Sequence, residues 1–154
     1  QFDRIANIIP VSNKIYIVEN PSVFLEIVSY IKKKGIENFS LICSSGELNM
    51  SFYLFMDKIE KEEIDIKYSG DFDPEGILIA QKIRKRYKNV KLFCYEKEIY
   101  MKRDNRKKLS DISIKKLENI VDEELKEIAE MIKINREGVY QENFLKEIME
   151  EIVR

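Results

Sequence analysis

The chain of 154 residues is long enough for one domain with a sizeable core and too short for two ordinary domains. Its 27 basic and 28 acidic residues give a formal net charge of −1, so any attraction for nucleic acid must be local. The sequence contains no histidine, which excludes Ser-His-Asp, Cys-His and histidine-zinc chemistry within this chain.

Further features bear on location, redox chemistry and completeness. No apolar run approaches 18 residues and no secretory leader is recognisable, so we expect a cytoplasmic protein without membrane contact. Cys43 and Cys94 lie inside apolar runs, where a reduced cysteine packs as a small hydrophobic side chain. Because the chain opens on Gln1, we expect a C-terminal fragment of a longer protein.

Strands and helices alternate along the first 100 residues. Runs rich in β-branched and aromatic residues predict four strands, at 14–19 (KIYIVE), 39–44 (FSLICS), 64–71 (IDIKYSGD) and 90–95 (VKLFCY). Helical spacing of apolar residues predicts helices between them, at 23–31, 48–59 and 79–87. This alternation indicates an α/β fold with a doubly wound, mainly parallel four-stranded sheet in the order 2-1-3-4.

Local signals mark the ends of these helices. The predicted starts are two capping residues that precede a proline (Asn20-Pro21 and Asp73-Pro74) and one capping box (Ser44 with Glu47). Gly35 fits the position after the last turn of the first helix.

The composition changes after the fourth strand. Segment 101–108 (MKRDNRKK) reads as a basic loop, and a helical pattern follows through Leu117, Val121, Leu125, Ile128 and Ile132. Gly138 should break the helix before a last one through residues 145–152. We therefore predict a single domain, 1–154, with a core at about 14–100 and a C-terminal helical extension at about 110–154 that packs on the sheet.

Three acidic residues stand at the ends of two of the predicted strands. Glu19 ends the first strand, and Asp71 and Asp73 lie two residues apart at the end of the third. In the order 2-1-3-4 these strands are neighbours, so the three carboxylates would meet in a crevice at the carboxyl edge of the sheet. A Mg²⁺ ion would relieve their repulsion, and the nearby helix N-termini would favour a phosphate.

Other interpretations of these acids remain open. Asp73 can be a helix cap and Glu19 a surface charge at a strand end. An EF-hand loop would need a glutamate where this chain has Lys82. A haloacid-dehalogenase-like phosphatase also begins with D-x-D after a strand, although here Pro74 and Glu75 follow in place of its usual small residue and Thr or Val.

The glutamate that ends the first strand, with D-x-D-x-x-G at the end of the third, resembles the Toprim domain of topoisomerases, primases and related nucleases. The motif here is Glu19, Asp71, Asp73 and Gly76, within residues 14–100. The phrases VENPSVF, LICSSGE, YSGDFDPEGILIA and YQENF more closely resemble the C-terminal Toprim-like domain, related to the topoisomerase VI A subunit, of Wadjet-type plasmid-defence nuclease subunits.

The resemblance implies a set of roles and partners. Asp71 and Asp73 would bind Mg²⁺ or Mn²⁺, and Glu19 would be a further metal ligand or the acid/base group at the scissile phosphate. Glu142 in YQENF is either an additional acid at this cleft or an exposed acid in the first turn of a helix. The implied partners are DNA and an SMC-like complex, and pairing with a second copy of the chain is a further expectation.

The densest basic cluster of the chain follows the fourth strand and would lie on the cleft side. We predict that Lys102, Arg103, Arg106 and Lys107, with Lys108 beside them, contact DNA phosphates; a solvated loop is the alternative. The predicted function is a metal-dependent DNA phosphodiester hydrolase. A degenerate Toprim module that binds DNA or a partner without cutting, and a small-molecule phosphatase, are the alternatives.

Overall fold

The structure is a computed structural model and describes residues 10–46, 48–59 and 64–154. A four-stranded parallel sheet forms its centre. Its strands are β1 (Lys14–Val18), β2 (Ser40–Cys43), β3 (Asp65–Ser69) and β4 (Val90–Leu92). They pair in parallel in the order β2-β1-β3-β4. The predicted fold class and strand order are therefore confirmed.

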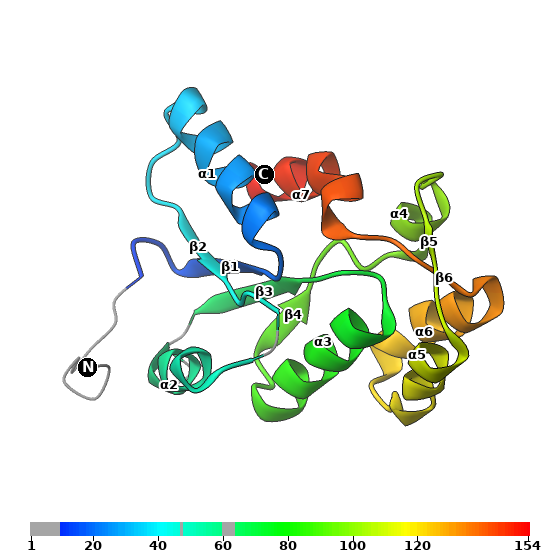
Figure 1. Ribbon diagram of the computed structural model, residues 1–154. Coiled ribbons are helices and arrows are strands. Elements are labelled where there is room, and N and C mark those ends of the chain that lie inside the picture. The colour runs from blue at the N-terminus through cyan, green and yellow to red at the C-terminus, as the bar shows by residue number, and fades with distance from the viewer. Residues whose placement is uncertain (1–9, 47, 60–63) are drawn as a thin grey trace.

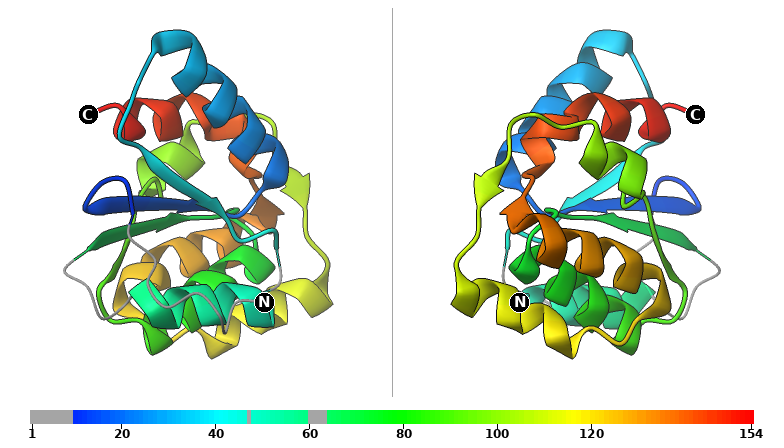
Figure 2. Two further views of the ribbon diagram at one scale, coloured as in Figure 1. Left: turned by 90° about the vertical axis from the view of Figure 1, so that its left-hand side faces the viewer. Right: turned by 90° about the vertical axis from the view of Figure 1, so that its right-hand side faces the viewer.

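Helices cover both faces of this sheet (Figure 1). Helices α1 (Pro21–Lys34) and α7 (Leu145–Ile152) lie on one face, and α2 (Met50–Ile59) and α3 (Pro74–Arg86) lie on the other, as the two side views in Figure 2 also show. The chain changes face after β2 because β2 and β3 lie on opposite sides of β1 and parallel crossovers are right-handed. Strands covered on both faces are continuously apolar, and Ile17 and Tyr68, which are partners in the ladder, are fully buried.

The N-terminal caps of α1 and α3 form as predicted. The side chain of Asn20 accepts a hydrogen bond from the Ser22 amide at 2.8 Å, and Asp73 accepts one from the Gly76 amide. Gly35 ends α1 in the left-handed conformation, with φ of 63°.

The start of α2 differs from the prediction. This helix begins at Met50, where the Asn49 side chain accepts from the amide of Phe52 at 2.9 Å, and not at a capping box on Ser44. Glu47, the other half of that box, lies outside the described residues. The reason is that Ser45 and Gly46 both have positive φ angles, which turn the chain before a helix can begin.

The C-terminal third contains several short elements. In chain order they are α4 (Lys97–Met101), β5 (Lys107–Lys108), α5 (Asp111–Lys115), the 3₁₀ helix η2 (Lys116–Asn119), α6 (Glu123–Asn135), β6 (Glu137–Gly138), the 3₁₀ helix η3 (Gln141–Phe144) and α7. Helices α5, η2 and α6 all pack against α3.

Two predictions for this region were wrong in detail. The helical pattern predicted from Leu117 onward is divided before α6, because Asp122 starts a new helix by capping the amide of Glu124 at 3.1 Å. Val121, predicted on the apolar face, is 70% exposed. The end of the basic segment is not a loop, because Lys107 and Lys108 form β5, which pairs antiparallel with β6.

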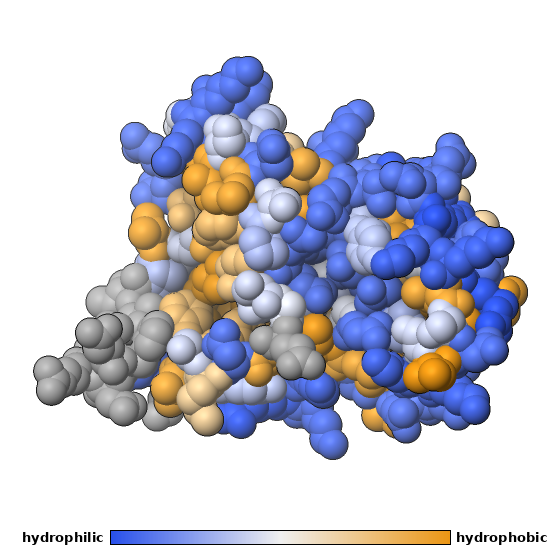
Figure 3. Space-filling view, viewed as in Figure 1, coloured by the Kyte–Doolittle hydropathy of each residue, from blue (hydrophilic) through white to orange (hydrophobic). Residues whose placement is uncertain are grey.

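The molecular surface has one apolar band in the view of Figure 3, where orange side chains gather along β2 between α1 and α2. β2 is an edge strand, and all four of its residues are partly exposed. Leu25 on α1 and Met50 on α2 are 65% and 71% exposed. None of the helices in the described part of the chain is long and apolar enough to span a membrane.

Candidate active site

The three predicted acids lie where β1 and β3 end side by side. Glu19 directly follows β1, Asp71 follows β3 after one glycine, and Asp73 precedes α3. Between the two aspartates, Phe72 is fully buried and forms a two-way backbone bridge with Val139, at 2.8 and 3.0 Å. Because side chains alternate along an extended segment, Asp71 and Asp73 both point away from the side on which Phe72 is packed.

A backbone amide holds one oxygen of each carboxylate. The amide of Asp71 donates to Glu19 Oε2 at 3.1 Å, the amide of Gln141 donates to Asp71 Oδ1 at 2.7 Å, and the amide of Gly76 donates to Asp73 Oδ1 at 2.8 Å. A carboxylate has about four lone-pair sites, so each of these groups keeps acceptor capacity for a ligand. The three acids are therefore fixed in place without being saturated.

The charged forms of the three carboxylates are destabilised by their surroundings. Burial is the main cause that raises the pKa of Glu19, Asp71 and Asp73. The pKa of Asp71 reaches about 7, since the charges of Glu19, Asp73 and Glu142 add to the effect of burial, while the amide of Gln141 opposes it. A positive ligand would lower the free energy of this cluster.

The donor set suits a hard cation. In the described residues no three His, Cys, Asp or Glu side chains form a ready-made metal-binding cluster. Mg²⁺, however, is usually held by only one or two carboxylates, with water and substrate phosphate completing its shell. Carboxylate oxygens with raised pKa values and free lone pairs match that requirement, so the residues fit Mg²⁺ or Mn²⁺.

Two buried tyrosines enclose the Glu19 carboxylate. A methyl group on Gly70 would lie 2.5 Å from Glu19 Oε2, 2.7 Å from the Tyr95 hydroxyl and 2.9 Å from the Tyr68 hydroxyl, so only glycine fits there. Tyr68 donates to Glu19 Oε2 at 3.5 Å. Cys94, with φ of 56°, turns the chain immediately before Tyr95. The Glu19 carboxylate is therefore close to two buried tyrosine hydroxyl groups.

Gly76, the glycine of D-x-D-x-x-G, is required at its position for a steric reason. A Cβ on Gly76 would lie 2.4 Å from the backbone oxygen of Asp71, closer than real Cβ atoms approach other atoms. The first turn of α3 thus passes directly against the backbone of residues 71–73, which we call the acidic segment. Asp73 can cap that turn only because the residue at 76 has no side chain.

A C-terminal segment that sequence reasoning did not assign completes the site. The Gln141 side chain is fully buried, and its Oε1 accepts from the amides of Glu19 at 3.2 Å and Asn20 at 3.0 Å. We call residues 138–142 the clamp segment, because they contact the acidic segment through Val139 and the end of β1 through Gln141. No local pattern marks Gln141, although it lies within the phrase YQENF.

Glu142 matches one of its two predicted descriptions. It is an exposed acid in the first turn of η3. Its Oε1 accepts from the Asn20 side chain at 2.8 Å, and its charge raises the pKa of Asp71. Glu142 is therefore close to Asn20 and to the charge of Asp71, and its role as an additional acid stays a prediction.

The two arginines of the basic cluster are engaged within the protein. Arg103 pairs with Glu147 on α7 and is mostly buried. Arg106 donates to the carbonyl of Arg103 at 2.7 Å, lies over the ring of Tyr100 at 4.8 Å and has Glu137 at 3.8 Å. These contacts fold the segment against the domain and leave the arginine groups little exposed.

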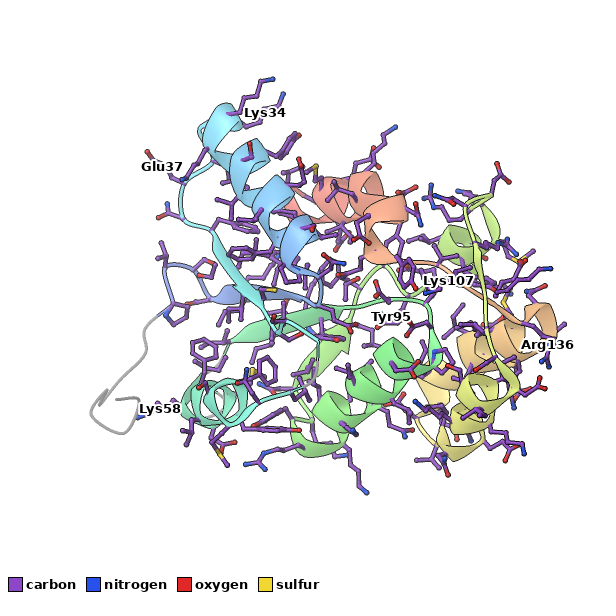
Figure 4. The ribbon with its side chains drawn as sticks, in the orientation of Figure 1. Lys34, Glu37, Lys58, Tyr95, Lys107 and Arg136 are labelled. Atoms are coloured by element: carbon purple, nitrogen blue, oxygen red, sulfur yellow. The ribbon has the colours of Figure 1, made fainter. Side chains whose placement is uncertain are left out.

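The lysines of the same cluster face solvent. Lys107 donates to the Tyr140 hydroxyl at 2.7 Å, and its charge lowers the pKa of Asp73, opposing the larger effect of burial. Lys102 and Lys108, which precede and follow Lys107 in the sequence, are also exposed. Figure 4 shows Lys107 beside the chain that links β3 to α3, on the same side of the molecule as Tyr95. Of the predicted basic residues, Lys107 is thus the one that the structure places in the field of the acids.

The family model described as "Protein of unknown function C-terminus (DUF2399)" matches residues 3–152, nearly the whole chain. The chain belongs to the DUF2399 family. A search of curated proteins found no match. The DUF2399 description assigns no activity, so a function for this chain has to be argued from its own site.

Proposed function

We propose that this DUF2399 chain is a Toprim-type domain that hydrolyses phosphodiester bonds in DNA with Mg²⁺ or Mn²⁺. The observation that carries the proposal is the position of Glu19, Asp71 and Asp73. They gather at the carboxyl edge of two adjacent parallel strands. Glu19 is buried, the two aspartates are partly buried, and a backbone amide holds each carboxylate. Ligands bind at this edge in open α/β sheets.

The three acids have different roles in the proposed reaction. Asp71 and Asp73 would hold the ion, which when bound would polarise the scissile phosphate and lower the pKa of a water molecule. Glu19 would exchange a proton with the reacting groups, because burial raises its pKa above that of an ordinary glutamate. The buried hydroxyl of Tyr68, which donates to Glu19 Oε2, keeps that carboxylate oriented.

Two features favour a phosphate in the cleft. The N-termini of α1 and α3 both begin beside the acids, and their partial positive charge favours an anion. Lys107 adds a full positive charge near Asp73, with Lys102 and Lys108 exposed on the same segment. Several exposed cations on one segment, one of them near Asp73, suit a polyanion such as DNA better than a small phosphomonoester.

The biological setting rests on resemblance alone. Likeness to Wadjet-type nuclease subunits is the support for a role in plasmid defence with an SMC-like complex, in the cytoplasm. Pairing with a second copy of the chain also stays a prediction. The hydrolytic activity can be tested without either partner.

The test uses neutral isosteres at two of the acids. Glu19→Gln keeps an acceptor for the Asp71 amide, and Asp73→Asn keeps the helix cap, because Asn and Asp cap helices equally well. Each should abolish Mn²⁺-dependent nicking of plasmid DNA without lowering the melting temperature, because each removes a carboxylate whose charged form is disfavoured by burial. Glu75→Gln is the matched control, since Glu75 starts the same helix but pairs with Lys116 at 2.6 Å.

Three outcomes would overturn the proposal. Full cleavage by either isostere would remove these acids from the mechanism. DNA binding without cleavage in the wild type would favour a degenerate module. Turnover of phosphomonoesters without DNA binding would favour a phosphatase.

A further inference from the structure

We propose that Gln141 is the positioning residue that assembles the metal-binding carboxylates, so that the site is completed by the C-terminal extension. This inference rests on the proposed metal-dependent function and names a residue that serves it. Gln141 contacts no reacting group in the proposed mechanism. It acts through Glu19 and Asp71.

Gln141 joins the two strands that supply the acids. Its side-chain Oε1 accepts from two successive amides at the end of β1, those of Glu19 and Asn20, at 3.2 and 3.0 Å. Its own backbone amide donates to Asp71 Oδ1 at 2.7 Å. One residue therefore fixes the backbone of the acid from β1 and the carboxylate of the acid that follows β3.

The residues just before Gln141 are held against the acidic segment. The neighbouring Val139 is held by two backbone hydrogen bonds to Phe72, which lies between the two aspartates. At Gly138, an added Cβ would lie 3.2 Å from Cβ of Asp73 and 3.1 Å from the Phe72 oxygen, so the clamp segment runs directly along the acidic segment. A shift of Gln141 would therefore be transmitted to Glu19 and Asp71 together.

The chemistry of an uncharged amide fits this position. The side chain is fully buried, and Nε2 has no hydrogen-bond partner in the described residues, so the group is held there by what Oε1 accepts. A carboxylate would accept the same two bonds but would add a charge beside Glu19 and Asp71. Glutamine supplies the acceptor without increasing repulsion in the metal-free protein.

The experiment measures Mn²⁺ affinity on the full chain, with free Mn²⁺ followed by electron paramagnetic resonance at pH 8. Gln141→Met has nearly the same length but no acceptor for the amides of Glu19 and Asn20. Residue 141 would then no longer be held at the end of β1, and its backbone amide would shift from the Asp71 carboxylate. Mn²⁺ binding should weaken about 10- to 100-fold, the usual cost of losing groups that orient metal ligands. Gln141→Glu restores an acceptor, and its charge does not repel a cation, so its affinity should stay at or above wild type.

A control separates positioning from general stability. Ile148→Val removes one methyl group from a fully buried residue on α7 and should lower the melting temperature without changing Mn²⁺ affinity. If Gln141→Met does not fold, Gln141→Asn replaces it, because a side chain one methylene shorter cannot reach both amides. The same loss of affinity is expected.

The outcomes distinguish this inference from the proposed function. Wild-type affinity in Gln141→Met, or an equal loss in Gln141→Glu, would overturn the positioning role while the metal site stands. Absence of Mn²⁺ binding in the wild-type chain would overturn both, and that result appears before any variant is made.

Discussion

Replacing Asp71 with asparagine should stabilise the metal-free protein at pH 8, although it removes a predicted metal ligand. Burial, with the neighbouring acids, raises the pKa of Asp71 from 3.8 to about 7. Each pKa unit corresponds to about 1.4 kcal/mol, so the charged carboxylate costs at most about 4 kcal/mol. Solvent screening and the unpaired amide protons of asparagine reduce the expected gain to about 1–3 kcal/mol.

The gain should depend on pH with a definite sign. Because the folded-state pKa of Asp71 lies above its unfolded value, this group favours folding below about pH 4, and that contribution is lost as the pH rises toward 7. Asparagine cannot ionise, so the stability difference between variant and wild type should be small at pH 4, grow as the pH rises toward 7 and be largest at pH 8.

Urea denaturation in EDTA at pH 5 and pH 8 measures this difference. Glu75→Gln is a control of opposite sign: although burial raises its pKa, Lys116 brings the pKa of Glu75 below its usual value. Removing that charge should destabilise the protein at pH 8. With Mn²⁺ added, the wild-type melting temperature should rise and that of Asp71→Asn should not. An Asp71→Asn protein no more stable than wild type at pH 8, or equally stabilised at both pH values, would refute the reasoning.

Two further predictions concern the helix start and the DNA path. Gly76→Ala should lower the free energy of unfolding by about 1–3 kcal/mol in urea despite the better helix propensity of alanine, because its Cβ would meet the Asp71 carbonyl oxygen; an unchanged value would contradict the close approach. Neutralising Lys102, Lys107 and Lys108 together should weaken binding to all DNA sequences. It should also reduce the slope of log affinity against log salt concentration by about 0.9 for each lost phosphate contact. An unchanged slope would place the DNA elsewhere.

The sheet and most of its helices were predictable because their signals are local. Runs rich in β-branched and aromatic residues mark the strands, although Asp65 and Lys67 interrupt β3 and Lys91 interrupts β4. Asn20-Pro21 and Asp73-Pro74 mark the starts of α1 and α3. The strand order then brings Glu19 and the two aspartates to one edge. The start of α2 was wrong because the positive φ angles at Ser45 and Gly46 turn the chain after Ser44, and the helix begins only after Asn49.

The rest depended on contacts between distant parts of the chain. Gln141 and Glu19 are 122 positions apart, and nothing in the residues around Gln141 distinguishes a buried acceptor from an exposed polar group. The basic cluster illustrates the same limit. Its charge was visible in the sequence, but the partner of Arg103 is Glu147 on α7, a pairing that only the folded chain specifies.

These distant contacts imply that the site is not a property of the D-x-D-x-x-G motif alone. The motif places Asp71 and Asp73 on one side of an extended segment, but that segment is extended where Phe72 pairs with Val139, outside the central sheet. One oxygen of Asp71 is then held by the amide of Gln141. The carboxylates thus come from the core at 14–100. Core groups hold Glu19 and Asp73, whereas the amide that holds Asp71 and the side chain that holds the end of β1 come from the C-terminal extension. The docked extension therefore contributes to the site, and any ligand bound to the acids should stabilise the extension as well.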